Sequence, residues 1–298
     1  MKIFLLSPET VPPNPHLFPT FINEFEKQGH SFVDRIEEAD CCFMDLHTRI
    51  ADYNQSDIDY ILGSEVPIAV WDEWDRLGMS EELWPMPLTG QQVAIFEHIS
   101  RKDINVVHFC RLMDSQLNWP KNVFPYEKPI IHEEPPVSAD DLFNRPYDIV
   151  WIANNAPQRE TLEQELRNES RLNCYISLGQ PKIPFNEWVD WHKKGKFFIT
   201  CSGGGATDER MQALFSVSTI LKERTDQLLH RDFEHMESCL RFDIPVTMKD
   251  LNDICRIARD KEALHQIYMD GYNFVKSFYS QEYMASRYIS ILNKHGIV

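Results

Sequence analysis

The residues of this sequence best suited to chemistry follow an apolar segment near position 200. Residues 197–201 are apolar and precede Ser202, three consecutive glycines and a helical pattern that carries Arg210. Glycine lets a backbone approach a ligand closely, because it has no Cβ and adopts positive φ at little cost. The free N–H groups of a helix start and the fork of an arginine both suit phosphate oxygens. The pattern predicts a phosphate or diphosphate site. A tight turn with a surface arginine stays an alternative, since no full G-x-G-x-x-G or Walker pattern is present.

Two further cations are expected at equivalent positions. Arg159 lies two residues after Pro157, at the start of a helical pattern that follows the apolar segment 147–153. Lys222 directly follows the apolar segment 217–221, at the end of the strand expected there. Proline suits an early helix position, and an arginine there would face an anion at the helix N-terminus. Each cation alone also fits an ordinary surface position. Because parallel strands end at one edge of a sheet, where ligands bind, the three cations together favour an anionic ligand.

An acidic cluster follows another expected strand, residues 67–71, in the first half. The segment reads Trp71-Asp72-Glu73-Trp74-Asp75. A carboxylate at the end of a strand could act as a general base, and the tryptophans could form a flat platform for a sugar or a nucleobase. An acidic loop with packed tryptophans explains the same residues. We do not predict a metal site, because the cluster has no suitably spaced histidine.

Other chemistries lack their motifs. His230 and His235 are five residues apart and would not share a helix face as zinc ligands do, so we expect ordinary histidines near a ligand cleft. No G-x-S-x-G nucleophile is present, and Ser7-Pro8-Glu9-Thr10 stands where a dinucleotide-binding fingerprint would need glycines. Hydride transfer with a nicotinamide is therefore disfavoured.

Length and composition favour a two-domain globular protein in a reducing compartment. A length of 298 residues suits two domains of about 150 residues each. No apolar run approaches the roughly 18 residues of a membrane helix, and the apolar start is too short for a signal peptide. The seven cysteines lack C-x-x-C spacing, so we expect a reducing compartment, the cytoplasm.

The charge of the chain is unevenly distributed. Residues 1–146 contain 11 Lys and Arg and 25 Asp and Glu, a net charge of −14, which leaves −2 of the total of −16 for residues 147–298. The first half should repel polyanions, whereas the second half tolerates an anionic ligand.

Short apolar runs alternate with helical patterns in both halves, which predicts α/β structure with parallel sheets covered on both faces. Four prolines between residues 127 and 146 indicate a linker. We expect a Rossmann-like domain at 1–137, a linker at 138–146 and a second Rossmann-like domain at 147–298. The last fifty residues are expected to be helical, with a buried stripe that includes Leu264, Ile267, Tyr268, Gly271 and Val275. Two such domains facing each other would form a ligand cleft between the carboxyl ends of their sheets.

The segment from Phe197 to Leu292 resembles the C-terminal part of GT-B-fold glycosyltransferases. It is most similar to the branch that includes CAP10-like and protein O-glucosyltransferases. The resemblance rests on an ordered series of residues that covers about a third of the chain. In order, these are the apolar strand, Gly204-Gly205-Ala206-Thr207 with Arg210, Leu214-Phe215, Ser218-Thr219-Ile220-Leu221-Lys222, Phe242-Asp243-Ile244-Pro245-Val246, Asp250-Leu251, Gly271 and Tyr283.

A second resemblance is to phage-type DNA β-glucosyltransferases, which also have the GT-B fold. Tyr147-Asp148-Ile149-Val150 with Gln158-Arg159-Glu160 is similar to the opening of their donor domain, and Ala69-Val70-Trp71-Asp72 to the strand that ends in their catalytic aspartate. The resemblance implies that Arg159 and Arg210 bind the donor diphosphate and that Asp72 is the base. It also implies that Gly204, Gly205, Thr207 and Lys222 contact the donor. In many relatives a glutamate three residues after the arginine binds the donor ribose, and here that residue is Ala213, beside Gln212.

The sequence thus predicts a metal-independent glycosyltransferase with its donor site in the second half and its acceptor site in the first. The expected co-substrate is a nucleotide-diphosphate sugar, a UDP-sugar, and the acceptor is a hydroxyl of a glycan, a lipid-linked sugar, a protein or a small molecule. We do not expect nucleic acid as the acceptor, because the first half is acidic. A non-catalytic nucleotide-sugar-binding protein, a nucleotide-sugar epimerase and a DNA glucosyltransferase remain alternatives. Glu73 or Asp75 could replace Asp72 as the base, and both inverting and retaining transfer fit the sequence.

Overall fold

The computed structural model describes residues 1–6, 18–45, 55–63, 66–72, 105–110, 121–127, 129–179, 183–201, 209–225 and 229–297. The chain forms two compact units. Unit 1 comprises Met1–Pro129, Gln227–His230 and Gln281–Val298, and unit 2 comprises Ile130–Asp226 and Arg231–Ser280. The domain boundaries expected from the sequence, at residues 137 and 147, stay a prediction.

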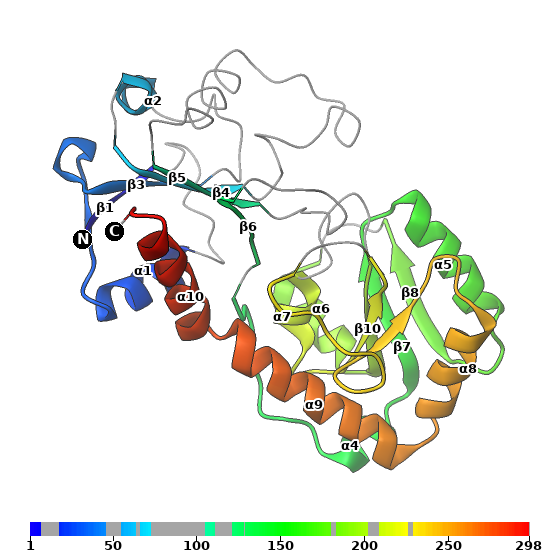
Figure 1. Cartoon of the computed structure of the whole chain (residues 1–298). Coiled ribbons are helices and arrows are strands. Elements are labelled where there is room, and N and C mark those ends of the chain that lie inside the picture. Colours follow the sequence, from blue (N-terminus) through cyan, green and yellow to red (C-terminus); the bar gives the residue numbers. More distant parts are fainter. Residues whose placement is uncertain are drawn as a thin grey trace. The chain divides into compact units, whose positions relative to one another are not determined.

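Unit 1 contains a parallel sheet of six strands in the order β2-β1-β3-β4-β5-β6. Phe25 of α1 and Met284 and Tyr288 of α10 pack against one face of the sheet, and Ile61 of α2 packs against the other (Figure 1). Because both faces are covered, the strands read as short apolar runs rather than as alternating patterns. The strands are β1 (Lys2–Leu6), β2 (Ser31–Val33), β3 (Cys41–Asp45), β4 (Ile68–Asp72), β5 (Val106–Cys110) and β6 (Val123–Pro125). The helices are α1 (Phe18–Lys27), η1 (Ile36–Glu38), α2 (Gln55–Gly63) and α10 (Gln281–Lys294).

Unit 2 contains a parallel sheet of five strands in the order β11-β10-β9-β7-β8. Leu162 of α5 and Leu251 of α8 pack on one face with Trp151 and Ile199, whereas Val189 of α6 and Met211 of α7 pack on the other with Phe198 and Ile220 (Figure 1). The strands are β7 (Tyr147–Ala153), β8 (Cys174–Leu178), β9 (Gly195–Thr200), β10 (Thr219–Glu223) and β11 (Leu240–Phe242). The helices are α4 (Ala139–Phe143), α5 (Pro157–Asn168), α6 (Phe185–His192), α7 (Glu209–Leu214), α8 (Met248–Ile257) and α9 (Lys261–Tyr279).

Both sheets have the same topology when their strands are numbered along the chain within each unit, 2-1-3-4-5 with a sixth strand in unit 1. The prediction of two doubly wound α/β units is therefore confirmed. The buried stripe expected on the C-terminal helices is also present, since Leu264, Ile267, Tyr268, Gly271 and Val275 of α9 are all buried.

Four elements differ from the expectation. The strand expected at 217–221 is β10, Thr219–Glu223, so that Lys222 lies inside the strand instead of after it. The strands β6 and β11, of three residues each, and the short helix α4, within the expected linker, were not predicted. Ser138 caps α4 by accepting a hydrogen bond from the backbone N–H of Asp141 at 3.1 Å.

Candidate functional site

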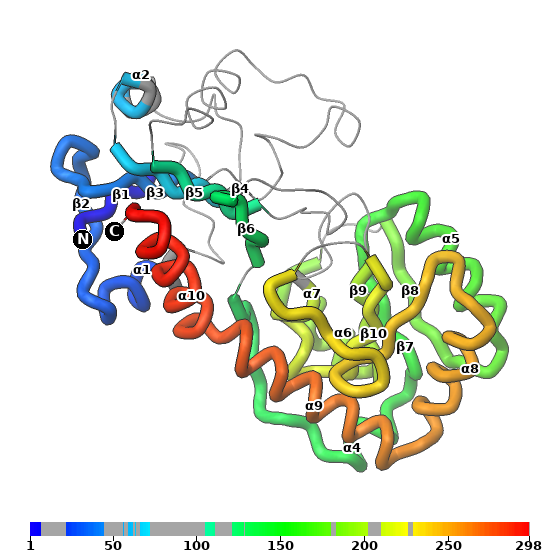
Figure 2. The backbone as a smooth tube through the Cα atoms, viewed as in Figure 1, coloured from blue at the N-terminus to red at the C-terminus, as the bar shows by residue number. Residues whose placement is uncertain are grey.

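The carboxyl edge of the second sheet has a topological switch point between β7 and β9. The chain leaves β7 through α5, which packs on one face, and enters β9 from α6, which packs on the other. Figure 2 traces these strands and the helices that connect them. Open α/β sheets bind ligands outside the carboxyl ends of their strands at such a point. The candidate site in unit 2 therefore lies beyond Ala153 and Thr200, the last residues of the two strands.

Arg159 reaches this edge from the first turn of α5. Pro157 occupies the start of the helix, and the N-cap residue Ala156 has no side chain that could cap the first N–H groups. The Nη1 atom of Arg159 donates to the carbonyl oxygen of Asn154 at 2.9 Å, so the guanidinium lies back over the loop after β7. A twelve-residue helix with an arginine in its first turn presents positive potential to this edge.

Arg210 reaches the same edge from α7, where its Nη1 donates to the carbonyl oxygen of Ile199 at 3.4 Å. Cys201 directly follows β9 and is buried. Burial raises the pKa of the Cys201 thiol to about 11, while the nearby charges of Arg210 and Arg159 act in the opposite direction. The charges of both guanidinium groups therefore act on one thiol at the end of β9. The structure brings together two of the cations that the sequence singled out.

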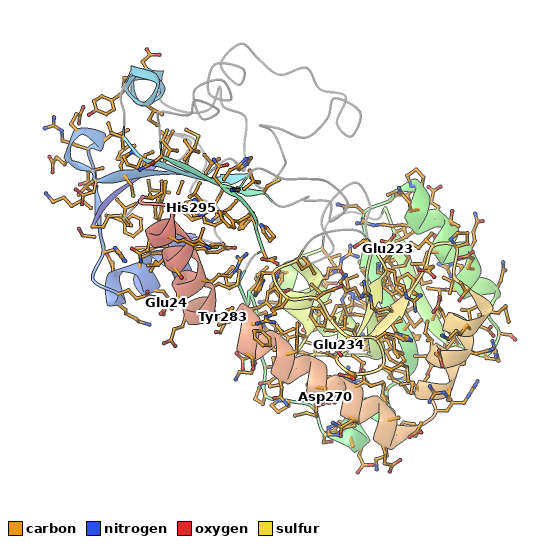
Figure 3. All side chains as sticks on the ribbon, viewed as in Figure 1. Glu24, Glu223, Glu234, Asp270, Tyr283 and His295 are labelled. Carbon is orange, nitrogen blue, oxygen red and sulfur yellow. The ribbon has the colours of Figure 1, made fainter. Side chains whose placement is uncertain are left out.

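Glu223 adds a carboxylate to this group, and the sequence analysis missed it. It is the last residue of β10, is 8% exposed, and its charge contributes to the raised pKa of Cys201. Figure 3 labels Glu223 on β10 in unit 2. A glutamate next to a lysine in a strand reads as an ordinary polar pair. The signal that could have found it is its place at the carboxyl end of a strand that neighbours β9.

Lys222 directly precedes Glu223 in β10. Side chains alternate along a strand, so Lys222 and Glu223 point to opposite faces of the sheet. The Nζ atom of Lys222 lies 3.6 Å from Oδ1 of Asp232, and the Lys222 side chain is 1% exposed. Burial lowers the pKa of Lys222, although the charge of Asp232 opposes this shift. The structure places this third cation on β10 with a partner that the sequence did not suggest.

Arg224 was also not predicted. It follows β10 and connects this strand to Asp243, after β11, and to Asp250, in the first turn of α8. Its guanidinium bonds both carboxylate oxygens of Asp250, at 3.0 and 3.2 Å, and lies 3.1 Å from Asp243. Asp250 is buried in the first turn of α8, where its Oδ2 also accepts the hydroxyl of Thr247 at 2.8 Å. Although burial favours its neutral form, the hydrogen bonds from Arg224 and Thr247 lower the pKa of Asp250. The spacing Thr247-x-x-Asp250 is that of a capping box, and it could have predicted the start of α8 and the place of Asp250 in its first turn.

The remaining donor residues, Gly204, Gly205 and Thr207, lie outside the described residues. In unit 1, Asp72 is the last residue of β4, next to Cys110 of β5, but its side chain and the residues Glu73 and Asp75 also lie outside. Trp71 is 1% exposed and packs between the rings of Phe43 and Phe109, at 4.6 and 4.9 Å. Trp71 is therefore a core residue and not part of a platform, which agrees with the alternative of packed tryptophans.

The two histidines have separate environments. His230 belongs to unit 1, where its Nδ1 lies 2.9 Å from the buried carboxylate of Glu127. His235 belongs to unit 2, where its Nδ1 accepts the backbone N–H of Arg241 at 2.9 Å. Burial, reinforced by the charge of Arg224, lowers the pKa of His235. Among the described residues no group of three or more His, Cys, Asp and Glu side chains is arranged to hold a metal ion.

No protein-family model and no curated protein sequence matches the chain. Solved structures do match it along nearly its whole length. An α-glucosyltransferase in complex with UDP and a DNA 13-mer superposes with a TM-score of 0.64 at 8% identity, covering 98% of this chain and 99% of the other. This chain has the GT-B fold.

Two further solved structures superpose on this chain along nearly its whole length. HepE of Anabaena, in complex with UDP and glucose, has a TM-score of 0.53 at 10% identity and covers 99% of this chain and 100% of its own. An α1,3-fucosyltransferase has a TM-score of 0.55 at 10% identity, covering 99% of this chain and 89% of its own. No helix of the described GT-B chain is long and apolar enough to cross a bilayer.

Proposed function

We propose that this protein is a glycosyltransferase that transfers a sugar from a UDP-sugar to a hydroxyl acceptor. The observation that carries the proposal is that Arg159 and Arg210 both reach the switch point of the second sheet, Arg159 at the carbonyl oxygen of Asn154 and Arg210 at that of Ile199. Two guanidinium groups on one sheet edge suit the diphosphate of a nucleotide. The GT-B structures with UDP named above support the nucleotide.

In this proposal each residue has a distinct role. Arg159 and Arg210 stabilise the negative charge that grows on UDP as the bond between the anomeric carbon and the diphosphate breaks. They supply, without a metal, the charge that a divalent cation supplies in other enzymes. The loop with Gly204, Gly205 and Thr207, together with Lys222, completes the donor site. Glu223 accepts hydrogen bonds from the donor hydroxyls, in place of the glutamate that Ala213 replaces.

Asp72 is the proposed base. It takes the proton of the acceptor hydroxyl as the acceptor oxygen attacks the anomeric carbon and UDP leaves, which inverts the configuration at that carbon. The acidic first half, with a net charge of −14, favours a glycan, lipid-linked, protein or small-molecule acceptor over DNA. Asp72→Asn should lower kcat by about 10²- to 10⁴-fold and keep donor binding. A fully active variant would move the base to Glu73 or Asp75, and a retained anomeric configuration would remove the base role.

The donor assignment can be tested by thermal unfolding with UDP, UDP-sugars and other nucleotides. UDP at about 100 times its Kd should stabilise the wild-type protein by roughly 2.7 kcal/mol. Arg210→Ala and Arg159→Ala should each weaken binding about ten- to a hundredfold, because each removes charge-assisted hydrogen bonds. Arg256→Ala is the matched control, since Arg256 is 54% exposed on α8 and pairs with Asp253 alone among acidic side chains of the described residues. No stabilisation by any nucleotide, or equal losses in all three variants, would refute the proposed function.

A further inference from the structure

The chain passes between its two units at three places. The first part of unit 1 ends at Pro129, the short segment Gln227–His230 belongs to unit 1 again, and the C-terminal segment from Gln281 onward does so as well. In chain order these are the first, second and third connections. They lie far apart in the sequence, so only contacts within the folded units can hold them together.

Glu127 holds all three connections together on the side of unit 1. It is buried and stands two residues before Pro129, at the first connection. Its Oε1 accepts the backbone N–H of His230, at the second connection, at 2.6 Å, and lies 2.9 Å from Nδ1 of the same residue. The backbone N–H and carbonyl of Glu127 both bond the hydroxyl of Tyr288 in α10, which follows the third connection, at 3.2 and 2.8 Å. Nη1 of Arg287, also in α10, lies 3.5 Å from Oε2 of Glu127.

Tyr279 has the equivalent place on the side of unit 2. It is the last residue of α9, directly before the third connection, and is 1% exposed. Its backbone oxygen accepts the N–H of Ile130, which follows the first connection, at 2.8 Å. Its hydroxyl donates to the backbone oxygen of Arg231, which follows the second, at 3.0 Å. The same three connections are therefore held together within each unit, by one residue on each side.

Little free chain is left between the contacts of Glu127 and those of Tyr279. The first connection has two residues between its held positions, the return of the second has none, and the third has one before α10 begins; these residues are Lys128, Pro129 and Ser280. Proline fixes its own φ, which removes freedom from the longest of these stretches. Since the reach of a flexible linker grows with its length, such short connections restrain the chain far more than a long linker would.

We propose that Glu127 is a positioning residue for sugar transfer, which acts by holding the three connections together on the side of unit 1. The proposal rests on the proposed function, in which the donor binds to unit 2 and the base, Asp72, belongs to unit 1. Binding of UDP needs unit 2 alone, whereas transfer needs groups of both units in one reactive geometry. A misplacement of about 1 Å can cost a reaction about a hundredfold in rate. Loss of Glu127 therefore lowers the rate of transfer and leaves donor affinity unchanged.

Two variants of Glu127 test this separation of rate from affinity. The reaction is followed as the release of UDP from UDP-glucose with water as the acceptor, because water needs the same base. Glu127→Ala removes the acceptor of the His230 N–H, so kcat should fall about ten- to a hundredfold, while the Kd of UDP from isothermal titration calorimetry stays within about twofold. Glu127→Gln keeps Oε1 as an acceptor and nearly the same size, so its kcat should stay within about threefold of the wild type. A folded Glu127→Ala variant with wild-type kcat refutes the positioning role.

Tyr279→Phe tests the same connections from unit 2 and serves if Glu127→Ala does not fold. It keeps the buried ring and the backbone oxygen that binds Ile130, and loses the hydrogen bond to Arg231. We expect kcat to fall about three- to tenfold with an unchanged Kd of UDP.

Glu24→Ala is the matched control. Glu24 is a buried glutamate of unit 1 as well, but it pairs with Lys27 of its own helix, α1 (Figure 3). Its replacement removes the same side chain at a distance in sequence from every connection, so it should lower stability and leave both kcat and the Kd of UDP unchanged. A loss of kcat in Glu24→Ala as large as that in Glu127→Ala would assign both effects to stability.

Hydrogen exchange measured by mass spectrometry gives a readout that does not depend on activity. In Glu127→Ala, but not in Glu24→Ala, peptides that contain Ile130 and His230 should exchange faster, while β3–β5 and β7–β10 keep their protection. Unchanged exchange at both connections would refute the proposal. If the wild type releases UDP but its kcat does not depend on Glu127, the positioning role is refuted and the proposed function stands. If the wild type releases no UDP, the proposed transfer fails, and exchange alone decides whether Glu127 holds the connections.

Discussion

Cys201 directly follows β9 and is buried, at the edge of the second sheet that Arg159 and Arg210 also reach. Because burial raises the pKa of Cys201 to about 11, in spite of Arg210 and Arg159, about one thiol in a thousand is ionised at pH 8. The thiolate is the reactive form, so iodoacetamide should alkylate Cys201 far more slowly in the folded protein than in urea. Peptide mapping by mass spectrometry measures both rates. Equal rates would show that the thiol is exposed and that the two arginines do not enclose it.

His192 gives the stability of unit 2 a specific dependence on pH. Burial lowers the pKa of His192 to about 4, and its Nδ1 lies 2.7 Å from the carbonyl oxygen of Trp188. The unfolded chain takes up a proton near pH 6.5, but the folded protein does so only near pH 4. The stabilisation is therefore complete above pH 6.5 and is lost as the pH falls to about 4, by roughly 3 kcal/mol. Urea unfolding of the wild type and of His192→Gln should differ in slope between these pH values, and parallel curves would contradict this prediction.

Residues that are placed by the local sequence pattern could be predicted from the sequence. Residues that are placed by partners far away in the sequence could not. Arg159 and Arg210 follow apolar strands, so their place at the sheet edge could be predicted from local pattern alone. Arg241 could not be predicted, because its strand has three residues and its partner Asp232 lies in an irregular segment. Trp71 is a second example. Its acidic neighbours allowed a ligand platform, whereas the rings of Phe43 and Phe109, tilted against it and stacked on it, hold it in the core.

The helix α9 passes close to the backbone of Ser238 at Gly271. A Cβ atom built there would lie 2.5 Å from the backbone oxygen of Ser238. Gly271→Ala gains about 1 kcal/mol of helix propensity, but the clash is with backbone and should cost more, about 1–3 kcal/mol net. Gly63 at the end of α2 is the control, because a Cβ there meets no atom within 4 Å of the described chain. Urea unfolding should show a loss of stability for Gly271→Ala and none for Gly63→Ala, and a stabilised Gly271→Ala would contradict the close contact.

Long elements were predictable and short ones were not, for a physical reason. α9 and α10 have 19 and 14 residues, so their apolar positions repeat often enough to define a buried face. β6 and β11 have three residues each, too few for any period, and they form because neighbouring strands offer hydrogen-bonding edges. α4 has five residues amid prolines and depends on its Ser138 cap. The same limit applies to Lys222, which lies inside β10 because this strand begins and ends two residues later than expected.

At the scale of the whole molecule, the two units share one sheet topology, and the C-terminal segment of the chain belongs to unit 1. α10 follows α9 after Ser280, yet its buried residues Met284, Ala285 and Leu292 pack with the strands of unit 1. The hydroxyl of Tyr288 donates to the backbone oxygen of Glu127 at 2.8 Å and accepts the backbone N–H of the same residue at 3.2 Å. The buried face of α10 is therefore part of the core of unit 1.

Deleting Gln281–Val298 should accordingly unfold unit 1 and spare unit 2. The deletion exposes the face of Trp71 and Phe109, on which the ring of Tyr288 packs at 6.0 and 4.6 Å, while both core clusters of unit 2 stay complete. Hydrogen exchange measured by mass spectrometry should show lost protection in β1 and β3–β5 and native protection in β7–β10. Tyr288→Phe is the milder control, because it keeps the ring and loses about 1–3 kcal/mol with the two hydrogen bonds to Glu127. If the deletion removes protection from both sheets together, the units fold as one cooperative body, and a donor site could not be studied in unit 2 alone.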